Sequence, residues 1–422
     1  MPAPTHLVLF TNVFPNDRVA EVTFVGPELS QLSAVFDQII VVPSVGGTVS
    51  CPLPNGAITV DETYPRMVHP DSTWSRIGYA IRGMSAPWSR AEVRRQLALL
   101  GSPRMLGRLL YCVVAAQRTG AWLTALLADG RLDPRRTLVY TFWLDYRTAG
   151  AGLARRCYPE LQIVSRAHGT DVYEDRHPLS YLPLRRHAVE TADQVFVVSE
   201  AARQHLQGRY PSHREAFVVA PLGTVDPGFR CPPSSDGVFR IVSCSRLIPQ
   251  KRIDRLIDAL ALVPGVRGDT RIEWHHLGGG EEQLRVKAHA EAALPTSVSW
   301  SCSGVVSPER VFSYYREHPV DLFVSVSASE GKPVSIMEAQ SASIPVLATA
   351  VGGVPEMVND SNGWLLASDP TPEEIASGIQ CAIQEHPSTE RRLASRRTWE
   401  SSHDAGRVSV NFAHRLRNLL DD

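Results

Sequence analysis

Cysteine is scarce in this chain, and its spacing follows no order. The 422 residues contain seven cysteines, an odd number, and no two of them stand in a Cys-x-x-Cys arrangement. A disulfide framework or a thiolate zinc site would need paired or closely spaced cysteines. The pattern therefore excludes a small disulfide-rich fold and favours the reducing cytoplasm, and no cluster of metal ligands is evident.

Long apolar runs and an excess of charge of one sign are also lacking. No run approaches the roughly 18 apolar residues of a membrane-spanning helix, and no basic region typical of a signal peptide precedes Leu7. The 43 basic residues nearly balance the 44 acidic ones, which leaves a formal net charge of -1. We therefore expect no nucleic-acid partner, and any anion-binding site must be local.

The length predicts two domains, because 422 residues exceed the roughly 250 to 300 that one hydrophobic core usually supports. Short β-branched runs alternate with helical patterns in both halves, which is typical of α/β domains with parallel sheets. A Pro/Ser/Gly stretch at 231–237 is typical of a linker. The expected strands are 7–10, 39–42, 137–142, 162–166 and 194–198, then 239–244, 273–277, 298–301, 322–326 and 345–348.

The first candidate site lies where basic residues crowd the start of a helix. Arg246, Lys251 and Arg252 stand between the strand at 239–244 and the helical pattern that follows it. Each cation there costs a few tenths to about 1 kcal/mol against the helix dipole unless an anion lies among them. A bound phosphate would reverse that cost. The alternative is that Asp254 and nearby acids neutralise the cluster.

The second candidate site follows the strand at 322–326. Gly331 allows a ligand to approach the backbone closely, and Pro333 is well placed as the first residue of a helix. Bare N–H groups at that helix start could bind phosphate, while the carboxylates of Glu330 and Glu338 could accept hydrogen bonds from sugar hydroxyls. The alternative is that Glu330 caps the helix and Glu338 is an ordinary exposed acid.

These motifs resemble those of the retaining GT-B glycosyltransferases of family 4, the glycosyl transferases group 1. Glu330 and Glu338, within Ser-Glu-Gly-Lys-Pro-Val-Ser-Ile-Met-Glu-Ala, match the EX7E signature of that family. Ser-Arg-Leu at 245–247 with Lys251, Leu-Gly-Gly-Gly-Glu at 277–281 and Thr-Ala-Val-Gly-Gly-Val-Pro-Glu at 349–356 match its flanking motifs. The glutamate spacing alone is a weak signal, but four motifs in the correct order are a strong one.

The resemblance implies an α/β fold of GT-B architecture, in which two Rossmann-like parallel-sheet domains face each other across a cleft. The expected parts are an acceptor-binding domain at 1–230, a donor-binding domain at 238–397 and a C-terminal helix at 398–422 that crosses back to the first domain. The implied activity is that of a retaining hexosyltransferase. It would move a sugar from a UDP- or GDP-linked donor to a hydroxyl of a bacterial glycan, glycolipid or cell-surface polysaccharide intermediate.

The same resemblance implies roles for individual residues. Arg246 and Lys251 should bind the donor diphosphate, Glu330 the hydroxyls of the donor sugar, and Glu338 the ribose side of the nucleotide. His168, within Ser-Arg-Ala-His-Gly-Thr-Asp, should contact the donor sugar near the reacting centre. The expected catalytic set is His168, Glu330, Arg246 and Lys251. Further donor contacts are expected from Gly279, Val306, Gly331, Lys332, Pro333 and Val334.

Three features of the sequence qualify this assignment. Lys332 stands where the family more usually has an apolar residue or glycine, and its role is open. Phe14-Pro15-Asn16-Asp17 stands where some relatives have a Gly-Gly pair, which leaves contacts from that loop open. Neither a metal nor a cofactor is expected besides the donor itself, because the cationic pair and the helix ends would stabilise the leaving diphosphate.

Residues 74–136 are strongly basic, with eleven arginines against three acidic residues and hence a local charge of +8. Trp88 and Trp122 interrupt this segment as interfacial anchors would, so it could hold the protein on the inner face of the cytoplasmic membrane. Helices packed on the first sheet with a solvated basic face are the commoner explanation of such a run, and the one we favour.

Two other classes of function remain compatible with the sequence. The acceptor could be a small-molecule natural product, or the protein could be a nucleotide-sugar-binding pseudoenzyme that scaffolds polysaccharide assembly. The same fold also serves phosphorylases and epimerases, so fold alone does not decide the activity.

Overall fold

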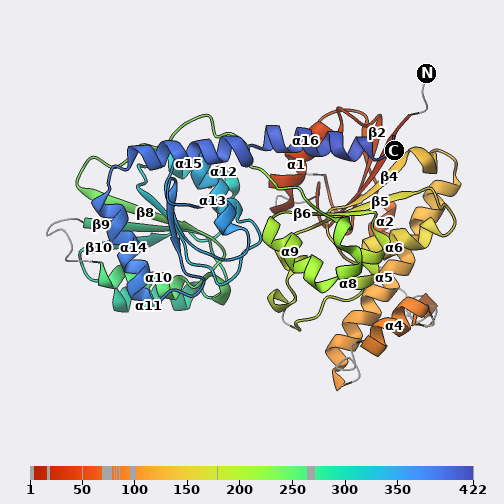
Figure 1. Cartoon of the computed structure of the whole chain (residues 1–422), viewed down its shortest axis with the longest axis horizontal. Coiled ribbons are helices and arrows are strands. Elements are labelled where there is room, and N and C mark those ends of the chain that lie inside the picture. The colour runs from red at the N-terminus through yellow and green to blue at the C-terminus, as the bar shows by residue number, and fades with distance from the viewer. Residues whose placement is uncertain are drawn as a thin grey trace. The chain divides into compact units, whose positions relative to one another are not determined.

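The computed structural model describes residues 4–16, 20–49, 51–68, 78–79, 81, 83–84, 86–95, 101–177, 179–263 and 271–421. The chain divides into two compact units, one formed by Met1–Ala220 with Ser409–Asp422 and the other by Pro221–Val408. Each unit contains a parallel sheet of its own with helices on both faces, as Figure 1 shows.

The first unit contains seven parallel strands, β1 (His6–Thr11), β2 (Gln38–Pro43), β3 (Ile58–Val60), β4 (Thr137–Thr141), β5 (Gln162–Ala167), β6 (Gln194–Val197) and β7 (Phe217–Val219). Their order in the sheet is β3-β2-β1-β4-β5-β6-β7. The chain runs outward from β1 to β3 and then restarts at β4 beside β1, so the strand order reverses between β1 and β4. Ligands of such sheets bind beyond the carboxyl ends of the strands at the reversal.

The helices around this sheet are α1 (Ala20–Leu32), α2 (Thr63–Val68), α5 (Pro103–Ala128), α6 (Tyr146–Arg155), α7 (Gly169–Val172), α8 (Arg185–Thr191), α9 (Glu200–Arg209) and α16 (Ala405–Asn418). The helix α4 (Pro87–Arg95) packs on α5. Side chains of β1 alternate between the faces. Leu7 and Leu9 pack with α1 and α16, whereas Val8 and Phe10 pack with α2, α5 and α6. Because helices cover both faces, every residue of β1 is buried.

The second unit contains six parallel strands, β8 (Val238–Cys244), β9 (Arg271–Leu277), β10 (Val298–Cys302), β11 (Leu322–Ser325), β12 (Val346–Thr349) and β13 (Gly363–Leu366). Their order is β10-β9-β8-β11-β12-β13, so the reversal lies between β8 and β11. The helices are α10 (Ile253–Leu262), α11 (Gln283–Ala293), α12 (Pro308–Glu317), α13 (Val334–Ser341), α14 (Pro372–Gln384) and α15 (Thr389–Ser402). Ile241 faces the layer of α10, α11 and α14, and Val242 faces that of α12, α13 and α15.

The sequence pattern predicts the centre of each sheet well. All ten expected strands are present, shifted by at most two residues at either end, and the two parallel-sheet domains are confirmed. The strands it misses are β3, β7 and β13, which have three or four residues and lie at sheet edges. The stretch at 231–237 is held on the second unit, because Cys231 is buried in its core and Ser234 donates its backbone N–H to Asp321.

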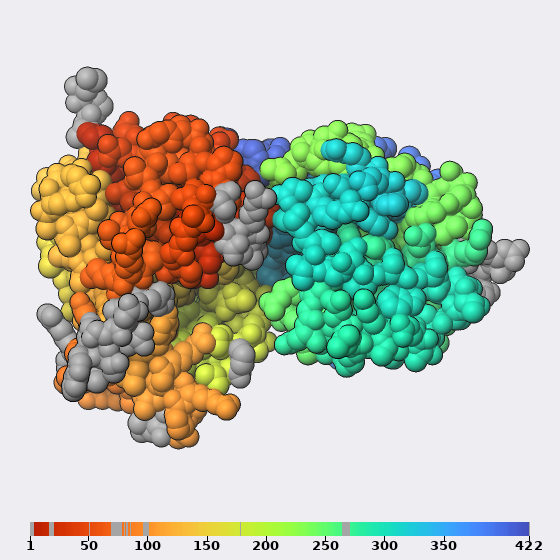
Figure 2. All heavy atoms as spheres, turned by 180° about the vertical axis from the view of Figure 1, so that it is seen from behind, coloured from red at the N-terminus to blue at the C-terminus, as the bar shows by residue number. Residues whose placement is uncertain are grey.

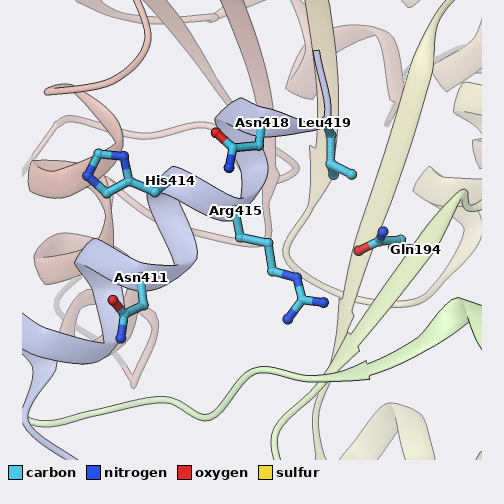
Figure 3. A pocket seen from close by; sticks show the side chains of 6 residues that line it. All are labelled: Gln194, Asn411, His414, Arg415, Asn418 and Leu419. Carbon is cyan, nitrogen blue, oxygen red and sulfur yellow. The ribbon is translucent and has the colours of Figure 1, made fainter. Parts of the chain in front are cut away.

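The helix α16 contributes to the core of the first unit through Phe412, Ala413 and Leu416. The ring of Phe412 lies 4.0 Å from the guanidinium carbon of buried Arg166. A pocket beside α16 reaches the first residue of β6 (Figure 3). The pocket is therefore at the amino end of the strands, away from the edge where ligands are expected. It is lined by Gln194, Asn411, His414, Arg415, Asn418 and Leu419.

The basic segment forms α4 and α5 where it is described; Trp74, Arg76 and Arg82 lie outside the described residues. Trp122 is 6% exposed, donates to Thr63 Oγ1 and packs on Phe10. An anchoring role for Trp122 is therefore wrong, because its ring belongs to the core. Trp88 is half-buried and stacks on His187. Of the helices that the structure describes, none combines the length and apolar character needed to cross a membrane.

Candidate functional site

Two loops meet at the reversal point of the second sheet. The loop 245–252 follows β8, and the loop 326–333 follows β11, the neighbouring strand. The helix α13 begins at Val334, one residue later than the sequence predicts, and Pro333 is its N-cap. The backbone N–H of Ala328 donates to Gln250 O, and Gln250 Nε2 donates to Ser329 O, both at 2.8 Å. The structure thus brings the two candidate sites together.

An ion pair joins the same two loops. Lys251 Nζ lies 2.5 Å from Glu330 Oε1, and the two side chains are 20% and 9% exposed. The alternative role of Glu330 as the cap of α13 is wrong, because the cap position is Pro333 and no side chain caps that helix. Glu330 is instead the counter-ion of Lys251.

The other two cations of the cluster differ from each other. Arg252 lies 3.0 Å from Asp369, so an acid does neutralise it, whereas Asp254 faces Arg285 instead. Arg246 is exposed, and it has no acidic partner in the described part of the chain. Among these three cations, Arg246 is therefore the one whose charge stays available for a bound anion.

Glu338 is buried rather than exposed, so its alternative as an ordinary surface acid is wrong. Only 5% of the residue is accessible, and its carboxyl group has no hydrogen-bond donor among the described residues. Burial raises the pKa of Glu338 to about 8. The hydroxyl of buried Tyr315, on which the charge of Glu338 acts, also lacks a partner in the described ranges. A buried acceptor without a donor is costly and invites a ligand hydroxyl.

Glycines let three loops approach at this edge. A Cβ on Gly278, whose φ is +144°, would lie 1.9 Å from Ser245 O, and one on Gly280 would lie 2.4 Å from Leu247 O. A Cβ on Gly279 would lie 2.9 Å from the backbone N of Val305. The loop after β9 therefore presses against the loops after β8 and β10. Val306 is partly buried against the core.

The motif at 349–356 braces the loop that carries Glu330. The backbone N–H of Gly353 donates to Gly331 O at 2.7 Å. Gly352 has φ +53°, and a Cβ there would lie 1.7 Å from Glu330 O. Lys332 is 6% exposed at its side chain, and its Nζ lies 3.6 Å from Glu356. Its charge also lowers the pKa of His403, although burial is the larger cause.

His168 belongs to the first unit, apart from the other predicted residues. It follows β5 directly, and its ring lies 4.7 Å from that of Phe142 and 4.6 Å from that of Trp143. Both ring nitrogens are buried, with no hydrogen-bond partner among the residues that are described. Burial, and then Arg166, lower the pKa of His168 far below its ordinary value. The imidazole is therefore neutral, with one donor and one acceptor unused.

Sequence reasoning missed Glu21, in the first turn of α1. Its carboxylate accepts hydrogen bonds from the backbone N–H groups of Val13 and Phe14, each at 2.8 Å, and from Asn12 N at 2.9 Å. Trp143 Nε1 donates to it at 2.6 Å. Three successive N–H groups form an anion-binding turn, and the chain fills it with its own carboxylate. The backbone N–H groups of the loop that lacks the Gly-Gly pair are thus already paired with the carboxylate of Glu21. Asp17, at the end of that loop, lies outside the described residues.

In the described ranges, no group of three or more His, Cys, Asp or Glu side chains could hold a metal ion. None of the seven cysteines forms a disulfide.

The buried carboxyl of Glu338 predicts a pH-dependent stability. Because its pKa is about 8 in the folded protein against 4.5 ordinarily, its contribution is fully present below pH 4.5 and is lost as the pH rises toward 8. We expect Glu338→Gln to raise the free energy of unfolding by about 1 to 4 kcal/mol at pH 8, and by little at pH 4.5. Urea unfolding at both pH values measures the difference, and an equal gap at both would contradict it.

Residues 232–398 match the family model described as glycosyl transferases group 1. The O-antigen biosynthesis glycosyltransferase WbnH of Escherichia coli is 30% identical over 128 residues, which are 30% of this chain and 33% of that protein. The chain thus spans about a third of the length of this curated relative.

Two solved structures are similar in fold. The apo form of the lipopolysaccharide outer core galactosyltransferase WaaB has a TM-score of 0.68 at 16% identity, and covers 97% of this chain and 99% of its own. Anabaena Alr3699/HepE in complex with UDP has a TM-score of 0.65 at 16% identity, and covers 98% of this chain and 100% of its own. The similarity to the glycosyl transferases group 1 model is thus confined to residues 232–398, whereas the two parallel-sheet domains of the chain share the GT-B architecture of these solved structures.

Proposed function

We propose that this protein is a retaining glycosyltransferase that moves a sugar from a nucleotide sugar to a hydroxyl of a bacterial glycan, glycolipid or cell-surface polysaccharide intermediate. The observation that carries the proposal is Glu338, a buried carboxyl group without a donor in the described chain, beside the loop of Arg246. A nucleotide sugar has the two groups that this edge of the sheet lacks, hydroxyl donors for Glu338 and a diphosphate for Arg246.

The loops of the second unit would stabilise the leaving diphosphate. Arg246 supplies a charge that no acid neutralises in the described residues, and Lys251 adds a second cation held in place by Glu330. The N–H groups of Gly331, Lys332 and Val334 lie at the start of α13, at the positive end of its helix dipole. These groups would act where negative charge develops as the glycosidic bond to phosphate breaks, so a metal ion is not required.

Glu330 and His168 would act on the donor sugar. Glu330 has a second carboxylate oxygen besides the one that contacts Lys251, and that oxygen can accept from a sugar hydroxyl. His168 is neutral with both nitrogens unpaired among the described residues, so it can donate one hydrogen bond and accept another. Such a residue holds a sugar hydroxyl without adding charge near the reacting carbon.

The similar proteins suggest which substrates to test first. The relative WbnH is named for O-antigen biosynthesis, and HepE was solved with UDP and with UDP-glucose. We therefore propose a UDP-linked donor, with a GDP-linked one second, and a polysaccharide or lipid-linked acceptor. The test is a panel of radiolabelled UDP-, GDP- and ADP-sugars followed for sugar release, with and without EDTA. Binding of every donor without release of sugar would favour the pseudoenzyme, and loss of activity in EDTA would contradict a metal-free site.

Arg246 and Arg252 form a matched pair for testing diphosphate binding. Arg246→Ala removes a cation with no acidic partner in the described chain, whereas Arg252→Ala removes one paired with Asp369. We expect the first to weaken UDP binding by about 1.5 to 3 kcal/mol, the usual contribution of a charge-assisted hydrogen bond, and the second to change it little. Isothermal titration calorimetry measures both. If the two variants bind UDP with equal affinity, Arg246 is not part of the diphosphate site.

The two glutamates should separate binding from turnover. Ribose hydroxyls would donate to an ionised Glu338, so UDP binding near pH 7 should release protons, because the pKa of free Glu338 is about 8. Calorimetry in buffers of different ionisation enthalpy should detect this release in the wild type and not in Glu338→Gln. Glu330→Gln should lower turnover with UDP affinity largely kept. The roles are misassigned if both variants lose UDP binding equally.

A basic surface on α4 supports a further proposal, peripheral association with the inner face of the cytoplasmic membrane. Arg90, Arg94 and Arg95 are exposed, and none forms an ion pair within the described ranges, although the charge of Arg95 acts on buried Glu92. The region of α4 and the start of α5 appears in orange in Figure 2. By contrast Arg118 is buried, and Arg131 lies 2.6 Å from Asp129.

Flotation with phosphatidylglycerol vesicles tests this proposal. Each arginine near an anionic surface contributes about 1 kcal/mol, and salt screens it. We expect the wild type to float at low salt and not at high salt, and the triple variant Arg90→Gln, Arg94→Gln, Arg95→Gln to float poorly. A control with the same loss of charge, at exposed Arg214, Arg397 and Arg407, should float like the wild type. If the wild type does not bind the vesicles at low salt, the membrane proposal is wrong and the basic surface of α4 is an ordinary solvated helix face.

A further inference from the structure

A chain of buried side chains ends on the loop that carries Arg246. Trp274 Nε1 lies 2.9 Å from Ser243 Oγ, Ser243 Oγ lies 2.8 Å from His276 Nδ1, and His276 Nε2 lies 3.1 Å from Ser245 O. Trp274, Ser243 and His276 are each at most 1% exposed. Ser243 is on β8, and the two rings are on β9, its hydrogen-bonded neighbour (Figure 1).

The two ends of this chain fix the direction of every hydrogen bond. An indole N–H only donates, so Ser243 Oγ accepts from Trp274 and gives its own hydrogen to His276 Nδ1. A carbonyl oxygen only accepts, so His276 Nε2 carries the ring hydrogen and donates it to Ser245 O. Burial lowers the pKa of His276 to about 4, which keeps the ring neutral in this tautomer.

The receiving carbonyl belongs to the peptide that leads into Arg246. The flanks of that peptide are held by the backbone, because Ser245 N donates to Leu277 O and Leu247 N donates to Gly279 O. The carbonyl itself is reached by His276. It is accessible only because Gly278 lacks a Cβ, which would lie 1.9 Å from the oxygen. His276 therefore sets the plane of the peptide from which the exposed side chain of Arg246 departs.

We propose that His276 is a positioning residue for donor binding, which orients the Ser245–Arg246 peptide so that Arg246 meets the diphosphate in a prepared direction. The inference rests on the function proposed above, because it needs a diphosphate beside Arg246. Prior orientation matters for an arginine, because its side chain otherwise loses much rotamer freedom when it binds. Packing alone would not require a buried imidazole here that is hydrogen-bonded at both of its nitrogens to residues distant in sequence.

Two amides separate the roles of the two ring nitrogens. In His276→Gln the amide nitrogen falls near the position of Nε2 and can still donate to Ser245 O, whereas the shorter amide of His276→Asn reaches only Ser243. We expect His276→Asn to weaken UDP binding about five- to twentyfold and His276→Gln about threefold or less, in line with the loss or retention of one hydrogen bond. Calorimetry with UDP measures affinity, and thermal unfolding shows how far each variant is destabilised.

A double-mutant cycle then asks whether His276 acts through Arg246. In the Arg246→Ala background, His276→Asn should change UDP affinity less than about twofold, because the group that it orients is gone. The same loss in both backgrounds, or equal losses for the Asn and Gln variants, would overturn the inference. If His276→Asn does not fold, Ser243→Ala serves in its place, since it frees the ring to turn and should show the same dependence on Arg246.

The cycle also separates this inference from the proposed function. Arg246→Ala that binds UDP as tightly as the wild type would overturn both the diphosphate site and the positioning role. A clear loss in Arg246→Ala together with additive effects of His276→Asn would overturn the positioning role alone.

Discussion

The site of the second unit is organised around the ion pair between Lys251 and Glu330. These residues follow β8 and β11, the neighbouring strands at which the order of the sheet reverses. Parallel strands end at the same edge, so the loops after them are adjacent, but adjacency alone does not fix their separation. The ion pair does so together with the two hydrogen bonds between Gln250 and the loop after β11. Arg246, the start of α13 and Glu338 all take their places relative to these two loops.

Much of the fold follows from the sequence because each central strand is buried on both faces. Residues 39–42 are apolar without interruption, and residues 322–326 are interrupted only by Ser325, so the pattern is visible in the sequence. The strands β3, β7 and β13 escape prediction because an edge strand of three or four residues carries too few buried side chains to form a pattern. The position of an edge strand is set by the strand with which it pairs, and that partner cannot be identified from the local sequence.

The candidate site, too, is only partly predictable from the sequence. Arg246, Lys251, Glu330 and Glu338 stand in local motifs, so their types and spacing could be read from the chain. Three other features could not be read from the chain, because each depends on residues distant in sequence. They are the burial of Glu338, the neutralisation of Arg252 by Asp369 rather than Asp254, and the position of Trp122 in the core. Glu21 is the clearest case. Its partners are a loop eight residues before it and Trp143, and only the folded sheet brings Trp143 to it.

The polar groups left over at this edge explain why the unliganded site is costly. Proteins pair nearly all their buried polar groups, and an unpaired one costs about 1 to 3 kcal/mol. Here the buried hydroxyl of Tyr315 has no partner in the described chain, and burial alone, without a hydrogen bond, shifts the pKa of Glu338. Selection for stability alone would remove such groups, whereas selection for ligand binding retains them. A ligand that pairs with these buried groups would bind only the folded protein, so its binding would raise the free energy of unfolding.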